Sequence, residues 1–216
     1  MGELLPYGEQ TSSEVTEIQG HLIDDPEFDA NQATVVLQRA IAARRSEREQ
    51  RVCAFEYPYM PEQGMIYYVP ADNKFMKRAK DYARNHSFDK NMPNCSIVVK
   101  DGVEIGIAAN GSSYHDLHGC ERKRLGSKTG EDYDKCEGCH PKNHGEPKAI
   151  ADALKNTDPE TVSGAEVYLW GHWWCCQPCW DAMLDNGVNS VFLLENSQVL
   201  FDREHTDNII GRQFEE

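Results

Sequence analysis

The chain has 216 residues, of which 39% are hydrophobic and 27% are charged, so it can bury a core and is not wholly disordered. Its 22 Lys and Arg residues against 36 Asp and Glu residues give a formal net charge of −14 at pH 7, which argues against nonspecific nucleic-acid binding. No apolar run approaches the roughly 18 residues of a membrane span. The N-terminus also lacks the basic and apolar regions of a signal peptide. We therefore expect a cytoplasmic protein that makes no membrane contact.

Residues 1–70 predict an N-terminal extension. It begins with a polar, acidic lead-in and continues with a helix over about residues 32–51, where apolar residues recur at helical spacing. A Pro-rich arm follows, with a short strand at residues 65–69. Residues 71–216 carry the more regular pattern and predict a single folded domain.

Residues 71–216 predict alternating helices and strands. Asp72 or Asn73 can cap a first helix. Two β-rich runs, at residues 96–100 and 103–108, are joined by an Asp-Gly pair, which is a strong hairpin signal. After a long irregular segment the later elements are a helix near Gly145, a strand over 166–170, a helix over 177–184, a strand over 190–194 and a further strand over 198–201. This order predicts an α/β fold, a three-layer α/β/α sandwich with a mixed sheet of about five strands.

The eight cysteines are the most informative residues in the composition. In a reducing compartment, clustered cysteines bind metal more often than they form disulfides. Cys53 and Cys95 stand apart, and the other six share one stretch with His140, His144 and His172. These six are Cys120, Cys136, Cys139, Cys175, Cys176 and Cys179.

Two short motifs open two successive predicted helices. His144-Gly145-Glu146 follows the irregular segment, and Cys176-Gln177-Pro178-Cys179 follows the strand after it. Cys-x-x-Cys at a helix N-terminus places two sulfurs on one face, where the helix dipole favours thiolates. One imidazole and two thiolates leave a tetrahedral Zn²⁺ with one position open for water. The pattern therefore predicts a zinc site with His144, Cys176 and Cys179 as ligands and Glu146 as a catalytic proton carrier.

An H-x-E motif followed by C-x-x-C is typical of zinc-dependent nucleobase deaminases. On these motifs, residues 73–201 resemble the cytidine/deoxycytidylate deaminase family, and Ala109-Asn110-Gly111 at the end of a strand adds to the match. The resemblance implies a cytidine-deaminase-like fold. It implies that a zinc-bound hydroxide attacks C4 of a cytosine ring while Glu146 shuttles protons. It also implies that Asn110 contacts the sugar, although an ordinary turn explains Asn110-Gly111 equally well.

The segment just before the cysteine pair departs from the family. Cys175 stands where the family usually has proline, either as a packed bystander thiol or as an alternative ligand. Trp173 and Trp174 replace smaller residues. Trp174 could stack on the pyrimidine or simply pack in the core. This departure leaves the choice of substrate open.

A second group of metal-binding residues lies in the irregular segment. Its pattern is Cys-x15-Cys-x2-Cys-His, formed by Cys120, Cys136, Cys139 and His140. A loop with few apolar residues cannot order itself by burial, and a structural zinc would supply that free energy; some deoxycytidylate deaminases look similar. His115 and His118 are alternative fourth ligands, free thiols are the other interpretation, and His140 could instead face the substrate.

The same segment carries a dense basic group: Arg122, Lys123, Arg124 and Lys128. These side chains could bind the 5′-phosphate of a nucleotide or simply form a solvated surface.

We expect hydrolytic deamination of a small cytosine nucleotide, from deoxycytidine monophosphate (dCMP) to deoxyuridine monophosphate and ammonia. The resemblance also implies a homo-oligomer, since members of this family look like homo-oligomers. The alternatives are a deaminase of RNA or single-stranded DNA, which would need a basic groove with exposed aromatic residues, and a non-catalytic zinc-stabilised scaffold for nucleotide binding or interaction.

Overall fold

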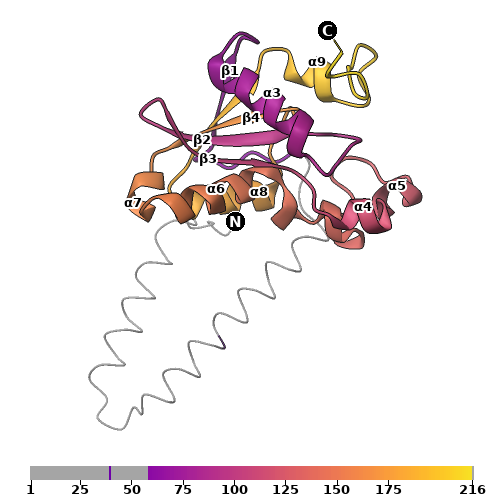
Figure 1. Cartoon of the computed structure of the whole chain (residues 1–216), viewed down its shortest axis with the longest axis horizontal. Helices are drawn as coiled ribbons and strands as arrows, with labels where there is room; N and C mark the ends of the chain where they lie inside the picture. The colour runs from indigo at the N-terminus through magenta and orange to yellow at the C-terminus, as the bar shows by residue number, and fades with distance from the viewer. Residues whose placement is uncertain (1–38, 40–57, 216) are drawn as a thin grey trace, which may run out of the picture. The chain divides into compact units, whose positions relative to one another are not determined.

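The structure is a computed structural model that describes residue 39 and residues 58–215. The predicted lead-in and, apart from residue 39, the predicted helix over 32–51 lie outside the described residues. The described part is built on one five-stranded sheet with the strand order β1-β5-β4-β2-β3 (Figure 1). Among these residues, none of the helices has the length and apolar character needed to cross a membrane.

The sheet is mixed, as the sequence predicts. Its strands are β1 (Met65–Val69), β2 (Cys95–Lys100), β3 (Val103–Ala109), β4 (Glu166–Trp170) and β5 (Ser190–Leu194). Strand β5 runs parallel to β1 and β4, whereas β2 runs antiparallel to β3 and β4. Strand β1 forms an edge of this sheet, although the sequence analysis placed it in the N-terminal extension. The folded sheet therefore includes residues before position 71.

The three helices that the sequence predicts after residue 71 are present, and four short helices that it does not predict accompany them among the described residues. They are α3 (Lys74–His86), α4 (Tyr114–His118), α5 (Glu121–Leu125), α6 (Gly145–Asn156), α7 (Pro159–Val162), α8 (Gln177–Leu184) and α9 (Ser197–Phe201), with 3-10 turns η1 (Tyr133–Lys135), η2 (Glu137–Cys139) and η3 (Pro141–Asn143). The Asn73 Oδ1 accepts hydrogen bonds from the backbone N–H groups of Phe75 and Met76, which confirms the predicted cap. Asp101 and Gly102 have φ angles of 51° and 75°, the left-handed conformation that a tight hairpin turn requires.

Helices cover both faces of the sheet (Figure 1). On β2, Val98 packs into the cluster that contains residues of α6 and α8, whereas Ile97 and Val99 pack with residues of α3 and α9. The three-layer α/β/α arrangement is therefore confirmed. A Cβ atom at Gly106 would lie 2.5 Å from the backbone oxygen of Ala149, so this glycine lets α6 lie directly on β3.

The prediction of a strand over residues 198–201 is wrong, because this segment forms the helix α9. A short apolar run fits a strand or a buried helix equally well, and only its surroundings decide. Here Phe201 is 2% exposed and its ring packs edge-on to Trp170, with 5.4 Å between ring centroids. The place beside β5 is occupied by β1, which comes from the other end of the domain.

Candidate active site

The structure brings His144, Cys176 and Cys179 together at one point. The His144 Nδ1 lies 3.4 Å from the Cys176 Sγ and 3.3 Å from the Cys179 Sγ, and the two sulfurs are 3.2 Å apart. All three ligand atoms lie within 4.8 Å of one another, close enough for a single ion to bridge them. One imidazole and two thiols form a donor set that fits Zn²⁺ with an open fourth position.

Two helix N-termini create this arrangement. His144 is the N-cap of α6, and Cys176 is the N-cap of α8, with Cys179 one turn further on. Burial raises the pKa of the Cys176 thiol, but hydrogen bonds with Cys179 and His144 outweigh it and lower that pKa to about 6. A thiolate at this position is the form that binds metal.

Glu146 lies in the same pocket as His144 and Cys176 and is 5% exposed. It occupies the first turn of α6, where the helix dipole favours a carboxylate. Burial, together with the nearby charge of this carboxylate, raises the pKa of the Cys175 thiol well above its usual value. Cys175 therefore stays a neutral thiol, and its sulfur is not part of the three-ligand group.

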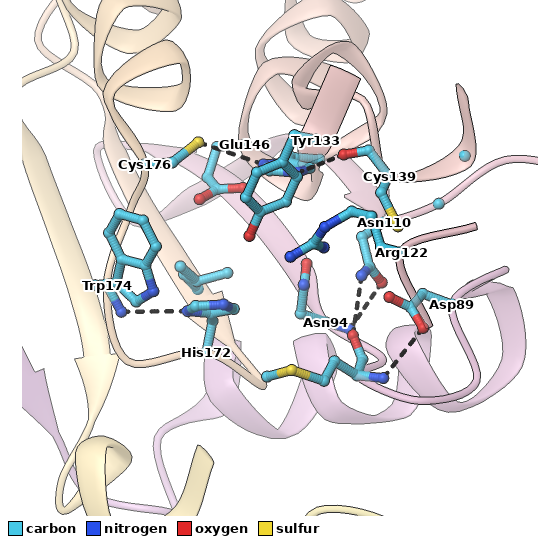
Figure 2. A pocket seen from close by; sticks show the side chains of 15 residues that line it. Asp89, Asn94, Asn110, Arg122, Tyr133, Cys139, Glu146, His172, Trp174 and Cys176 are labelled. Atoms are coloured by element: carbon cyan, nitrogen blue, oxygen red, sulfur yellow. Dashed lines mark hydrogen bonds between the residues drawn. The ribbon is translucent and has the colours of Figure 1, made fainter. Parts of the chain in front are cut away.

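His144, Cys176 and Glu146 line a pocket whose walls come from distant parts of the chain (Figure 2). Asn110 also lines it, but its amide mainly fastens the loop after α3. Its Oδ1 accepts from the Ser87 hydroxyl at 2.6 Å and from the Asn94 N–H at 2.9 Å, and its Nδ2 donates to the Met92 carbonyl at 2.9 Å. Three of its four hydrogen-bonding positions are therefore used within the protein. The Asn94 Oδ1, in contrast, is buried and has no hydrogen-bond partner among the described residues.

His172 is a pocket residue to which the sequence analysis gave no role. Its Nδ1 accepts from the backbone N–H group of Trp173 at 3.1 Å. It also accepts from the backbone N–H group of Trp174 at 3.4 Å (Figure 2). Burial lowers its pKa to about 3. The ring is therefore neutral near pH 7, and because Nδ1 accepts, the proton is on Nε2. A single His that follows a glycine and precedes two tryptophans gives no local signal for this role.

The depressed pKa of His172 predicts acid sensitivity of the fold. Between its ordinary pKa of 6.5 and about 3, the unfolded chain binds a proton at this site that the folded chain excludes. Stability should therefore fall as pH falls through this window, by up to about 1.4 kcal/mol per pH unit. His172→Asn keeps an acceptor for the two backbone N–H groups and does not titrate. In urea unfolding at pH 5 and pH 7.5, the variant should lose less stability than the parent, and parallel losses would contradict the assignment.

A second cavity of about 240 Å³ shares Tyr133, His172 and other residues with the pocket. Its lining includes Arg122, Lys123 and Arg203, the last of which sequence reasoning missed. The Arg122 guanidinium lies 3.8 Å above the Tyr133 ring and donates to backbone carbonyls of its own loop.

Within the predicted basic group, the remaining arginine, Arg124, pairs with Glu121 at 2.9 Å and lines neither cavity. Lys123 Nζ donates to the Asn91 Oδ1 at 3.2 Å. Both groups of this contact line the second cavity. Among the predicted basic residues, the structure therefore brings Lys123 and Arg122 to the cavity.

The second predicted metal group is also assembled, with one correction. Its three cysteines, Cys120, Cys136 and Cys139, are joined by His115, and all four ligand atoms lie within 4.8 Å of one another. His140 is not part of this group. It caps η3, where its Nδ1 accepts from the Lys142 N–H at 3.2 Å, so the ring is turned toward its own backbone.

One protein family and several solved structures are similar to this chain. Residues 70–195 match the sequence model of the cytidine and deoxycytidylate deaminase zinc-binding region. Among solved structures, the chain is similar to a diaminohydroxyphosphoribosylaminopyrimidine deaminase/5-amino-6-(5-phosphoribosylamino)uracil reductase from Thermotoga maritima, with 23% identity over 55% of this chain and 28% of that one and a TM-score of 0.34. It is also similar to RibD from Acinetobacter baumannii, with 20% identity over 55% and 26% of the two chains and a TM-score of 0.30. The chain thus spans about a quarter of the length of these two proteins. Curated proteins gave no match.

Proposed function

This chain belongs to the cytidine and deoxycytidylate deaminase family, and we propose that it converts dCMP to deoxyuridine monophosphate and ammonia. The family binds zinc. When bound to His144, Cys176 and Cys179, the ion would act as the Lewis acid that makes water nucleophilic near neutral pH. We also propose a reducing, cytoplasmic location, which suits the free thiols of the seven cysteines among the described residues.

The buried carboxylate beside the three ligands is the observation that carries the proposal. Glu146 shares the pocket with His144 and Cys176 and is within reach of a molecule bound there. It accepts a proton from the attacking water and passes it to N3 as the C4–O bond forms and the C4=N3 double bond opens. It then takes the proton of the C4 hydroxyl and donates it to the exocyclic nitrogen, as the C4=O bond forms, the C4–N bond breaks and ammonia leaves. A non-catalytic scaffold would have no use for a buried carboxylate at this position.

The second cavity supports a nucleotide rather than a nucleoside. Lys123 and Arg203 are exposed residues that line it, and the pocket of Glu146 lies next to it. Cationic side chains at the entrance can bind a phosphate that is attached to the base in the pocket. Lys123 follows Arg122 on α5, whereas Arg203 comes from the segment after α9.

The buried tryptophans favour a small substrate over a base within RNA or DNA. Single strands are bound by exposed aromatic rings on which successive bases stack. Trp174 is only 5% exposed and Trp173 is partly buried, and their ring centroids are 6.1 Å apart. Trp174, which lines the pocket, is therefore suited to form the wall of a closed site rather than an exposed surface for stacking successive bases.

Ammonia release by the purified full-length chain tests the proposal. The substrates are dCMP, deoxycytidine, cytidine monophosphate and a cytosine-containing oligonucleotide, each with the zinc content of the protein measured in parallel. We expect the largest kcat/KM for dCMP. Faster turnover of the oligonucleotide would overturn the choice of a small substrate, and no turnover of any cytosine compound by the zinc-loaded protein would overturn the reaction.

The phosphate contact predicts a selective defect in Lys123→Ala and Arg203→Ala. A hydrogen bond to a charged group contributes about 1.5–3 kcal/mol, so each change should raise the KM for dCMP about 10-fold or more. The KM for deoxycytidine, which has no phosphate, should stay the same. Arg124→Ala removes a charge from the same helix but lines neither cavity and is the matched control. Equal effects on dCMP and deoxycytidine would contradict the phosphate role.

A further inference from the structure

The cluster of His115, Cys120, Cys136 and Cys139 has the composition of a closed metal site. The His115 Nε2 lies 3.5 Å from the Cys136 Sγ and 3.4 Å from the Cys139 Sγ, and the sulfurs of Cys120 and Cys139 are 3.5 Å apart. Three thiols and one imidazole fill all four positions of a tetrahedral zinc and leave none for water. This donor set is typical of structural zinc rather than catalytic zinc.

Apolar contacts do little to order the helices that carry two of these ligands, His115 on α4 and Cys120 at the start of α5. Helices α4 and α5 contain no buried residue, and their leucines, Leu117 and Leu125, are 76% and 57% exposed. Burial of apolar surface therefore contributes little to holding these two helices, and a bound metal would supply that free energy. The absence of a side chain at Gly138 lets the His115 ring approach the cysteines, because a Cβ atom there would lie 2.4 Å from that ring.

Cys139 links this cluster to the candidate active site. Its sulfur belongs to the cluster, and its carbonyl oxygen lies 3.1 Å from the His144 Nε2. Figure 2 shows the carbonyl oxygen and the sulfur of Cys139 pointing in different directions. A carbonyl can only accept, so the proton of His144 is on Nε2 and the Nδ1 lone pair faces the sulfurs of Cys176 and Cys179.

A second contact, between Tyr133 and His144, also links the cluster to the candidate active site. Tyr133, between the cluster and the pocket, packs edge-on to His144 with 5.2 Å between ring centroids. The Arg122 guanidinium covers its ring. Arg122 comes two residues after Cys120, so the position of the cluster also sets the position of this aromatic wall.

We propose that His115, Cys120, Cys136 and Cys139 bind a second, structural zinc, which holds the Cys139 carbonyl against His144 and thereby strengthens zinc binding at the active site. The coupling rests on the proposed ligand role of His144, Cys176 and Cys179. Hydrogen-bond partners of metal-bound histidines typically change metal affinity by about 10- to 100-fold. His115 and Cys120 are thus positioning residues that act on the active site through Cys139.

The zinc content of the full-length protein tests the site itself. We expect two zinc ions per chain in the parent and one in His115→Ala, Cys120→Ser and Cys176→Ser. His118→Ala is the matched control, since His118 lies on the same helix and outside the cluster. It should keep both ions. A parent with a single zinc that Cys176→Ser removes would overturn the second site. This readout is independent of turnover, so failure of the proposed reaction would be recognised separately.

Competition with a chelator tests the coupling. In Cys120→Ser, the remaining zinc should dissociate with a constant about 10- to 100-fold larger than that of the active-site zinc in His118→Ala. Equal constants would overturn the coupling. Gly138→Ala keeps all four ligands and crowds His115, so it replaces Cys120→Ser if circular dichroism shows that the latter is unfolded. Cobalt substitution identifies the ions, because thiolate-to-cobalt absorption from the active site should be lost in Cys176→Ser and retained in His115→Ala.

Discussion

Replacement of Glu146 with glutamine is expected to lower the turnover of dCMP by about 10²- to 10⁴-fold without loss of zinc. Glutamine has nearly the same shape as glutamate but cannot accept a proton from water or donate one to the leaving amine. Because Glu146 is buried beside His144 and Cys176 and is not one of the three ligands, its loss should impair the reaction and not the site. Ammonia release and zinc content, measured on the same preparation, check the prediction.

The effect should appear in kcat rather than in KM, because the proton transfers occur after the substrate is bound. Glu160→Gln is a suitable control, since Glu160 is an exposed carboxylate on α7 that does not line the pocket. It should leave both parameters unchanged. If Glu146→Gln kept the activity of the parent, Glu146 could not be the proton carrier, and the proposed mechanism would fail.

Loss of a thiolate from the three-ligand site is the second change with a large expected effect. Cys176→Ser and Cys179→Ser should each lower the zinc content by one ion per chain and abolish measurable turnover. A serine hydroxyl is not deprotonated near neutral pH, whereas the hydrogen bonds in the site lower the pKa of Cys176 to about 6. Elemental analysis of the purified variants and the ammonia assay check both parts.

Cys175→Ser provides a closely matched control. Cys175 is the next residue in the chain and is also buried, but its sulfur lies outside the group of three ligand atoms. The variant should keep the zinc ion of the active site. If zinc were lost from Cys175→Ser and kept in Cys176→Ser, Cys175 would be the ligand, as the sequence by itself allowed.

Local signals in the sequence were sufficient for most of the elements and for the central residues of the site. The Asn73 cap and the Asp101-Gly102 turn depend only on neighbouring residues, so the first helix and the hairpin could be predicted. The spacing of Cys176 and Cys179 is also a local signal. Residues three apart at the start of a helix lie on one side of it, so the sequence could predict that these two sulfurs lie close together. The roles proposed for these ligands and for Glu146 stay predictions until the variants are measured.

The tertiary structure decided every feature that depends on how distant segments meet. The edge strand β1 joins a strand more than a hundred residues later, so no local pattern could separate it from the N-terminal extension. The same holds for Arg203 at the second cavity. The choice of His115 over His140 as the fourth group at the second cluster also required the path of the loop. His140 is adjacent to Cys139 in sequence, but its ring caps its own turn, whereas His115 reaches the sulfurs across Gly138. Sequence spacing fixes direction only within a helix or strand; between elements, packing decides which side chains meet.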